Sequence, residues 1–198
     1  MNSQALLIVD VQIDFCRGGA LVVPQGDRVV AALNQYIAYF RYKGRTIMAS
    51  RDWHPINSKH FKTHGGLWPE HCLQNTRGAD FHPKLKLPQE TVILSKGMDE
   101  NKNGYSVFEA QTPAGEPFKD VLKRLHIDTL FVGGLATEFC VQSTVLDALQ
   151  QGWQVELLTD AIQGIGPAAC RAAMDMMLME GAHPMTLMGL KQQEKQHV

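Results

Sequence analysis

The chain has 198 residues, of which 44% are hydrophobic and 20% are charged, and its formal net charge at pH 7 is −1. This length and composition are typical of one globular domain with a sizeable core. A near-neutral charge without long blocks of one sign argues against partners such as nucleic acid or an anionic membrane surface.

The N-terminal sequence and the cysteines favour a cytoplasmic protein. The start, "MNSQALLIVDVQ", lacks the basic region and long apolar core of a secretory signal. No run reaches the ~18 apolar residues that cross a bilayer. The four cysteines form no CxxC pair, so neither a zinc ribbon nor a thioredoxin motif is indicated. In a reducing compartment we expect free thiols.

Strand-like and helix-like segments alternate along the chain. Short apolar runs predict strands, and apolar residues at helical spacing predict helices. The expected strands are 5–9, 46–50, 91–94, 129–134, 153–160 and, less regular, 184–189. The expected helices are 26–44, 117–127, 138–151 and 167–181. The polar tail from residue 190 is expected to fray.

This alternation predicts an α/β fold with a single doubly wound, mostly parallel sheet and helices on both faces. We find no internal repeat, linker or second domain, so residues 1–198 are expected to form one domain. No glycine-rich phosphate-binding motif follows the first strand, which argues against a nucleotide site.

The region 51–90 departs from the alternating pattern. It contains four prolines and five of the chain's 8 histidines, and it predicts a long loop with short pieces of structure at most. Loops of this length inside a compact domain are usually functional.

Three chemically capable side chains fall at the ends of predicted strands. Asp10 closes the first strand, Lys96 follows the strand at 91–94, and Cys140 follows the strand at 129–134. Ligands of parallel sheets bind outside the carboxyl ends of the strands. A thiol beside a base, an ammonium group and a helix N-terminus makes a plausible nucleophile. Each also has a structural alternative: a turn cap, an ion pair, or a thiol that fills a gap in the core.

The long loop also predicts a metal site. Asp52, His54 and His60 lie within nine residues, and His71 follows. Imidazole and carboxylate groups at short spacing suit Zn²⁺, Fe²⁺ or Mn²⁺. His64 and His82 are present in the same loop, so composition alone does not choose the ligands.

Three aromatic residues lie beside these polar candidates: Phe15, Trp68 and Tyr105. Core packing explains each one singly. Together they are also suited to form the walls of a slot for a flat ring.

Six separated stretches carry a family resemblance. They are "LLIVDVQIDFCRGGAL", "SRDWHPINSKHF", "WPEHC", "GADFHP", "SKGMD" and "GGLATEFCVQSTVLDA". In this order they closely resemble the nicotinamidases, which belong to the isochorismatase-like cysteine hydrolase superfamily. The resemblance runs from about Ala5 to beyond Ala161.

The resemblance implies a role for each candidate. It implies a catalytic set of Asp10, Lys96 and Cys140. It implies an oxyanion hole from the N–H groups of Ala136 and Cys140, with a cis peptide bond at Leu135–Ala136. It implies one divalent metal, most simply Zn²⁺, on Asp52, His54, His60 and His71. It implies substrate walls formed by Phe15, Trp68 and, less securely, Tyr105. Glu138 stands where the family often has Asp, and the sequence of the segment after "SKG" varies within the family.

The implied activity is hydrolysis of nicotinamide to nicotinate and ammonia through a cysteine thioester, a step of NAD salvage, with pyrazinamide as a second substrate. A homo-oligomer is compatible with it. One alternative is another amidohydrolase of the superfamily, acting on a carbamoyl or ureido substrate, although those relatives lack the metal set. A second alternative is a non-catalytic module whose loop 51–90 holds a structural zinc ion.

Overall fold

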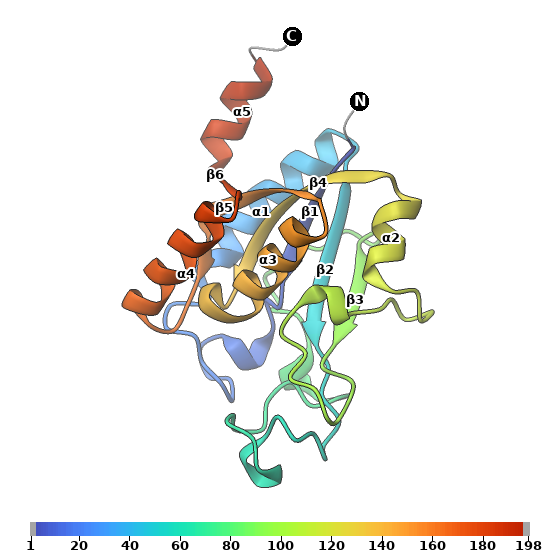
Figure 1. Ribbon diagram of the computed structural model, residues 1–198, viewed down its shortest axis with the longest axis vertical. Coiled ribbons are helices and arrows are strands. Elements are labelled where there is room, and N and C mark those ends of the chain that lie inside the picture. Colours follow the sequence, from blue (N-terminus) through green and yellow to red (C-terminus); the bar gives the residue numbers. More distant parts are fainter. Residues whose placement is uncertain (1–2, 196–198) are drawn as a thin grey trace.

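The fold is built on one six-stranded sheet. The computed structural model describes residues 3–195. Within these residues the strand order is β3-β2-β1-β4-β5-β6, and every neighbouring pair is parallel (Figure 1). The strands are β1 (Ser3–Val9), β2 (Thr46–Asp52), β3 (Val92–Lys96), β4 (Ile127–Leu135), β5 (Gln154–Gln163) and β6 (His183–Met185). The predicted doubly wound sheet is confirmed, and it is fully parallel across the described residues.

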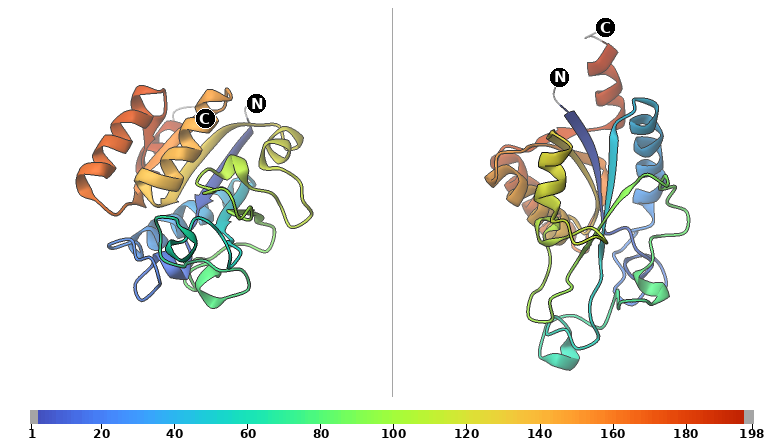
Figure 2. Two further views of the ribbon diagram at one scale, coloured as in Figure 1. Left: turned by 60° about the horizontal axis from the view of Figure 1, so that its bottom comes forward. Right: turned by 90° about the vertical axis from the view of Figure 1, so that its right-hand side faces the viewer.

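Helices cover both faces of this sheet. They are α1 (Arg28–Tyr42), α2 (Phe118–Arg124), α3 (Gln142–Gln150), α4 (Pro167–Met179) and α5 (Leu187–Lys195). Buried side chains of α1 and α5 share one apolar core, and those of α2, α3 and α4 share the other. Figure 2 shows the sheet edge-on between α1 on one side and α2 and α3 on the other. The central strand β1 is therefore buried on both faces, which explains its continuous apolar run.

The long loop region lies where the strands end. In Figure 1 the strand arrows point toward the teal loop at the bottom of the molecule. Its regular structure, besides the end of β2, amounts to two 3₁₀ turns, η2 (Lys62–His64) and η3 (Arg77–Ala79). The expectation of a loop with only short pieces of structure is confirmed. The carboxyl edge of the sheet thus faces the histidine-rich segment.

The C-terminal expectations need correction. The last strand is only His183–Met185, and the tail does not fray within the described residues: Leu187–Lys195 form α5. Leu187 and Leu190 are buried, and Glu194 bonds to side chains from α1 and the turn after it. Tertiary contacts therefore order a segment that its local composition marks as polar. Residues 196–198 of the predicted tail lie outside the described residues.

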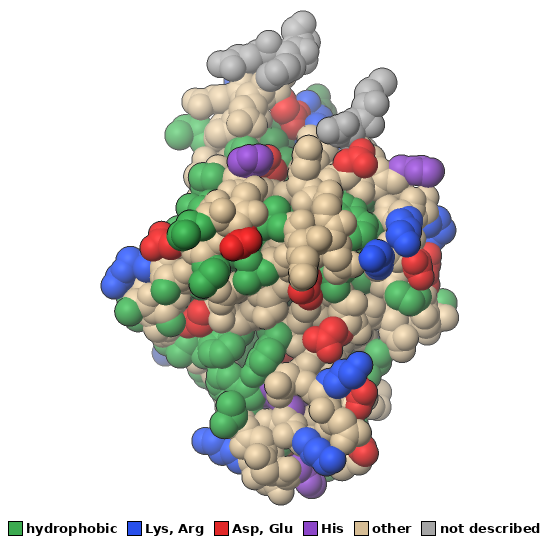
Figure 3. All heavy atoms as spheres, viewed as in Figure 1, with side chains coloured by type: hydrophobic (Ala, Val, Ile, Leu, Met, Phe, Trp, Pro, Cys, Tyr) green, Lys and Arg blue, Asp and Glu red, His purple; other side chains and the backbone are tan. Residues whose placement is uncertain are grey.

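The surface agrees with the mixed charge of the sequence. On the face shown in Figure 3, acidic and basic side chains are interspersed. Among residues 3–195, no helix combines the length and the apolar character required to span a bilayer.

Candidate active site

The ends of four neighbouring strands bring the catalytic candidates together. Asp10 directly follows β1, Asp52 ends β2, and Lys96 ends β3. Cys140 lies in the π-helical turn η5 (Thr137–Val141), immediately after β4. The register of β2 and β3 sets Asp52 directly beside Lys96. The parallel strands thus bring these groups together at one edge of the sheet, although they lie up to 130 residues apart in the sequence.

Lys96 is the hub of the group. Its Nζ lies 2.8 Å from Asp10 Oδ2 and 2.5 Å from Asp52 Oδ1. It also lies 2.9 Å from the carbonyl oxygen of Gly104 and 3.3 Å from Cys140 Sγ. The side chain is fully buried. An ammonium group has three protons, so these four acceptors saturate it and fix its position.

Burial and charge together set the protonation states. Burial opposes the charged form of Lys96, but Asp10 and Asp52 outweigh it and raise the pKa of this ammonium well above its usual range. Burial also acts against ionised Asp52, yet Lys96 and His54 hold the pKa of that carboxyl below its usual range. The site therefore contains one permanent cation against at least one permanent anion.

The surroundings of the Cys140 thiol favour its protonated form. Burial raises its pKa well above the usual range, with Lys96 acting in the opposite direction and Asp10 adding to the rise. Burial likewise raises the pKa of Asp10, whose Oδ1 accepts a hydrogen bond of 2.7 Å from Ser50 Oγ. Oxygens of Asp10 and Asp52 and the sulfur of Cys140 lie within 4.8 Å of one another. Asp10 is thus within reach of the thiol proton.

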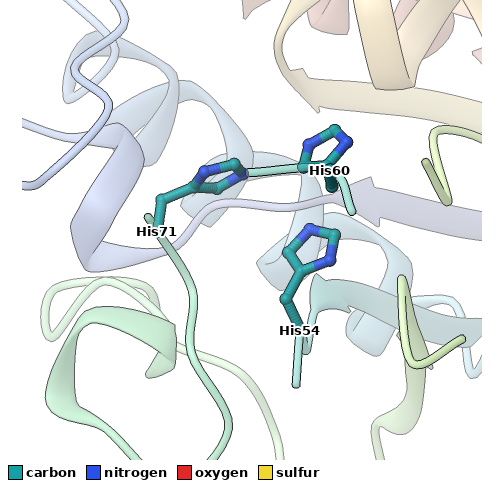
Figure 4. A group of neighbouring side chains, drawn as sticks. All are labelled: His54, His60 and His71. Carbon is teal, nitrogen blue, oxygen red and sulfur yellow. The ribbon is translucent and has the colours of Figure 1, made fainter. Parts of the chain in front are cut away.

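Three histidines gather beside this group. Ring nitrogens of His54, His60 and His71 lie within 4.8 Å of one another, and the three residues are buried. Figure 4 shows the rings facing a common space from three positions of the loop. Asp52 Oδ2 lies 3.7 Å from His54 Nε2 and 4.0 Å from His71 Nε2. The three histidines therefore form one group, and Asp52 lies beside it, within 4.0 Å of His54 and His71.

Hydrogen bonds at the rims orient two of the rings. His71 Nδ1 lies 2.8 Å from the carbonyl oxygen of Pro69, which only accepts, so Nδ1 carries the proton and Nε2 presents a lone pair. His60 Nδ1 is bonded in the same way to Asn103 Oδ1 at 3.0 Å. Both ring nitrogens of His54 are buried without a hydrogen-bond partner. Buried nitrogens without a partner are costly, and a divalent metal would satisfy one of the two. The residues fit such an ion.

The two remaining loop histidines lie elsewhere. His64 is exposed in η2. His82 Nε2 lies 3.3 Å from Asp27 Oδ1, and its Nδ1 accepts the backbone N–H of Lys84 at 3.2 Å. Because Nδ1 is an acceptor there, the proton of a neutral His82 sits on Nε2 and points at Asp27. Cys16 lies near this pair, but His82 has no free lone pair to offer a metal.

A pocket opens between the thiol and the histidines. Its walls are mainly apolar and aromatic with a few polar groups, which is typical of small-ligand sites. All three predicted walls line it: Phe15, Trp68 and Tyr105. Trp68 Nε1 donates to the Tyr105 hydroxyl at 2.8 Å, which locks these two walls together. The other lining residues are Leu21, Val23, Asp52, His60, His71, Ala136, Phe139, Cys140 and Ile165.

The predicted oxyanion-hole residues also reach this pocket. Ala136 and Cys140 both line it. The peptide bond Leu135–Ala136 is cis, as the resemblance implies. Phe139 is a wall that sequence reasoning missed. Its position directly before the candidate nucleophile was the available signal.

Glu138 and Gly97 are two further residues whose roles the sequence did not reveal. Glu138 Oε1 accepts the backbone N–H groups of Ile165 and Gly166 at 2.8 and 2.9 Å, at the start of α4. This cap connects η5 with the loop that carries Ile165 to the pocket. Gly97 packs against the His54 ring, where an added Cβ would lie 2.4 Å from Cε1.

Comparison with known proteins adds independent observations. Residues 4–188 match the family described as "Isochorismatase domain". The chain is 38% identical to the nicotinamidase of Escherichia coli over 198 residues, which covers 92% of this chain and 93% of that one.

Two solved structures are similar in fold and sequence. A pyrazinamidase of Pyrococcus horikoshii in complex with zinc is 42% identical, with a TM-score of 0.87 and coverage of 93% of this chain and 99% of that one. The PnC1 protein of L. infantum in complex with nicotinate is 32% identical, with a TM-score of 0.84 and coverage of 93% of each chain.

Proposed function

The chain belongs to the isochorismatase-domain family, and we propose that within it the protein is a nicotinamidase, which hydrolyses nicotinamide to nicotinate and ammonia. One observation carries this proposal. The thiol of Cys140 lies 3.3 Å from the Lys96 ammonium and shares its pocket with aromatic walls and with His60 and His71 of the three-histidine group. Similarity to nicotinamidases and to a nicotinate-bound structure supports the same substrate class.

The first half-reaction forms a thioester. Asp10 takes the proton of Cys140, and Lys96 stabilises the thiolate by its charge. The sulfur attacks the amide carbon, and the N–H groups of Ala136 and Cys140 receive the developing oxyanion. Such donors typically contribute about 3–4 kcal/mol each to the transition state. Asp10 then gives its proton to the amide nitrogen as the C–N bond breaks, and ammonia leaves.

The second half-reaction releases the acid. Asp10, again a carboxylate, removes a proton from water, and the resulting hydroxide attacks the thioester carbon. The C–S bond breaks, the Cys140 sulfur regains a proton from Asp10, and nicotinate leaves. The buried position of both groups keeps each proton within the pair.

The residues that would hold a metal ion are Asp52, His54, His60 and His71. Three imidazoles and one carboxylate favour Zn²⁺ over harder ions, with Fe²⁺ and Mn²⁺ as lesser candidates. When bound, the ion supplies a Lewis acid for the ring nitrogen of the substrate. Phe15, Trp68 and Tyr105 would hold the ring flat, so pyrazinamide is expected to enter as well.

We further propose that residues 1–198 act as one hydrolase domain whose metal-binding region is the loop 51–90. We place the reaction in the cytoplasm, as a step of NAD salvage. One observation supports this location: the four cysteines are free in the structure, as expected in a reducing compartment.

The decisive experiment measures ammonia release from nicotinamide. Cys140→Ala should lower kcat by roughly 10³-fold or more, because the nucleophile is lost. Cys170→Ala removes a thiol outside the pocket and should retain activity. Chelation should abolish turnover by the parent chain, and zinc should restore it.

Two results would overturn the assignment. The first is near-normal ammonia release by Cys140→Ala. The second is a clear preference of the parent chain for a carbamoyl or ureido substrate over nicotinamide, which would favour the alternative amidohydrolase.

A further inference from the structure

Three consecutive residues after β3 contact three different parts of the site. The Asn103 side chain meets the His60 ring at 3.0 Å, and the Gly104 carbonyl accepts from Lys96 at 2.9 Å. The Tyr105 hydroxyl accepts from Trp68 at 2.8 Å. We call residues 103–105 the site strap. Its residues contact, in order, the His60 ring, the Lys96 ammonium group and the Trp68 side chain.

We propose that Asn103 is a positioning residue for the metal centre, which fixes His60 in the tautomer and orientation that a metal ligand needs. This inference rests on the metal centre of the proposed function. Asn103 Oδ1 accepts the Nδ1 proton of His60, so the Nε2 lone pair is left for the ion. Metal-bound histidines commonly depend on such an acceptor at the other ring nitrogen.

Asn103 is the hydrogen-bond partner that the structure gives to His60 Nδ1. The ring stacks on His54 at a centroid distance of 4.7 Å and meets His71 at 5.4 Å. Neither neighbouring ring accepts a proton from His60 Nδ1 in the structure. Without Asn103, the ring is free to turn or to carry its proton on Nε2. In that tautomer an N–H group points at the metal position and coordination is lost.

His60 differs from His71 in the origin of its acceptor. His71 uses the backbone carbonyl of Pro69, two residues away in the same loop. His60 uses a side chain from a segment 43 residues away. A single substitution at Asn103 therefore removes the acceptor and leaves the loop backbone unchanged.

Neighbouring contacts hold Asn103 in register with His60. The backbone N–H of Lys59 donates to the carbonyl of Glu100 at 2.7 Å. Lys59 Nζ donates to Asn101 Oδ1 at 2.7 Å. These bonds dock residues 100–101 on the loop directly before the ligand. Through Asn103 and Gly104 the site strap contacts both His60 and Lys96. One short segment therefore positions a candidate metal ligand and the ammonium group.

The test is zinc affinity, measured by competition with a chromogenic chelator. Asn103→Ala should weaken zinc binding by roughly 10–100-fold, the usual effect of removing an outer partner of a metal ligand. Asn103→Asp keeps an oxygen acceptor and should bind zinc at least as tightly as the parent. Lys102→Ala is the control: it changes the exposed residue directly before Asn103 without touching His60, and should bind zinc like the parent.

Kinetics separate positioning from a general structural role. At saturating zinc, Asn103→Ala should recover the parent kcat for nicotinamide, because the defect lies in metal retention. Unchanged zinc affinity in Asn103→Ala, or an equal loss in Lys102→Ala, would overturn the proposal. A parent chain that binds zinc but does not hydrolyse nicotinamide would refute the proposed function alone. A parent chain that binds no zinc would refute this inference as well.

Discussion

Gly97 illustrates how closely backbone approaches the metal group. Its φ is +67°, and an added Cβ would lie 2.4 Å from His54 Cε1 and 2.7 Å from Nδ1. Only glycine combines that backbone conformation with that contact at no steric cost. The residue directly after Lys96, the proposed catalytic lysine, therefore also determines where a candidate metal ligand lies.

Substitution of this glycine should affect stability and metal binding together. Gly97→Ala should destabilise the fold by more than the ~1–2 kcal/mol expected for a left-handed alanine alone, since the new methyl group displaces the His54 ring. Zinc affinity should fall with it. Gly115→Ala is the control, since φ is +84° there but no atom lies within 4 Å of the added Cβ. Urea denaturation and chelator competition on both variants check the prediction, and equal behaviour of the two would contradict it.

At the scale of elements, α5 is held by a charged cluster rather than by its own sequence. Glu194 accepts from Tyr39 at 2.7 Å, from Arg45 at 2.6 Å and from Lys43 at 2.9 Å. Burial opposes its ionisation, but these three partners lower the pKa of Glu194 to about 2. The helix is thereby attached to α1 and to the turn before β2.

This pKa predicts how α5 responds to acid. A carboxyl whose pKa is lowered on folding adds stability above its unfolded value, near 4.5, and loses that contribution as the pH falls toward 2. The parent should therefore be more stable than Glu194→Gln at pH 7, by about 1 kcal/mol, and the difference should shrink from pH 5 to pH 2. Glu180→Gln, at an exposed helix end, is the control. Denaturation at several pH values measures both, and a difference that grows in acid would refute the prediction.

At the scale of the whole molecule, the active site is a product of sheet order. β1, β2, β3 and β4 are neighbours in the sheet, and each delivers one polar group to the same edge. The loop between β2 and β3 lies over that edge with the histidines. A metal bound there would join the loop to the sheet, so its removal should lower the stability of the whole fold.

Zinc should therefore raise the melting temperature. A ligand that binds only the folded state at 100 times its Kd stabilises it by about 2.7 kcal/mol. For a domain of this size that corresponds to a rise of roughly 5–10 °C. His71→Ala should remove the rise, and His64→Ala, which changes an exposed histidine of the same loop, should keep it. Thermal unfolding with zinc and with chelator measures this. An equal rise in His71→Ala would exclude that ligand.

Local sequence predicted the framework and the chemistry. The continuous apolar run before Asp10 and the one before Cys140 indicated buried parallel strands, because side chains covered on both faces leave no polar alternation. Their polar ends indicated where a site lies, because parallel strands end at one edge. The ligand residues required more than local pattern, and the resemblance of separated motifs selected His54, His60 and His71 over His64 and His82.

The tertiary structure alone decided the remaining features. Asn103 and Glu138 act through contacts with segments distant in sequence, and nothing in their immediate neighbours distinguishes them. Phe139 adjoins the candidate nucleophile, but only the folded chain shows that it lines the pocket. The same holds for α5. Its polar composition suggested fraying, but in the fold Glu194 bonds to side chains about 150 residues away in the sequence. Periodicity records which face of an element is buried. It does not record which polar atoms of two distant segments will meet, because that depends on register and loop path, which only the assembled fold sets.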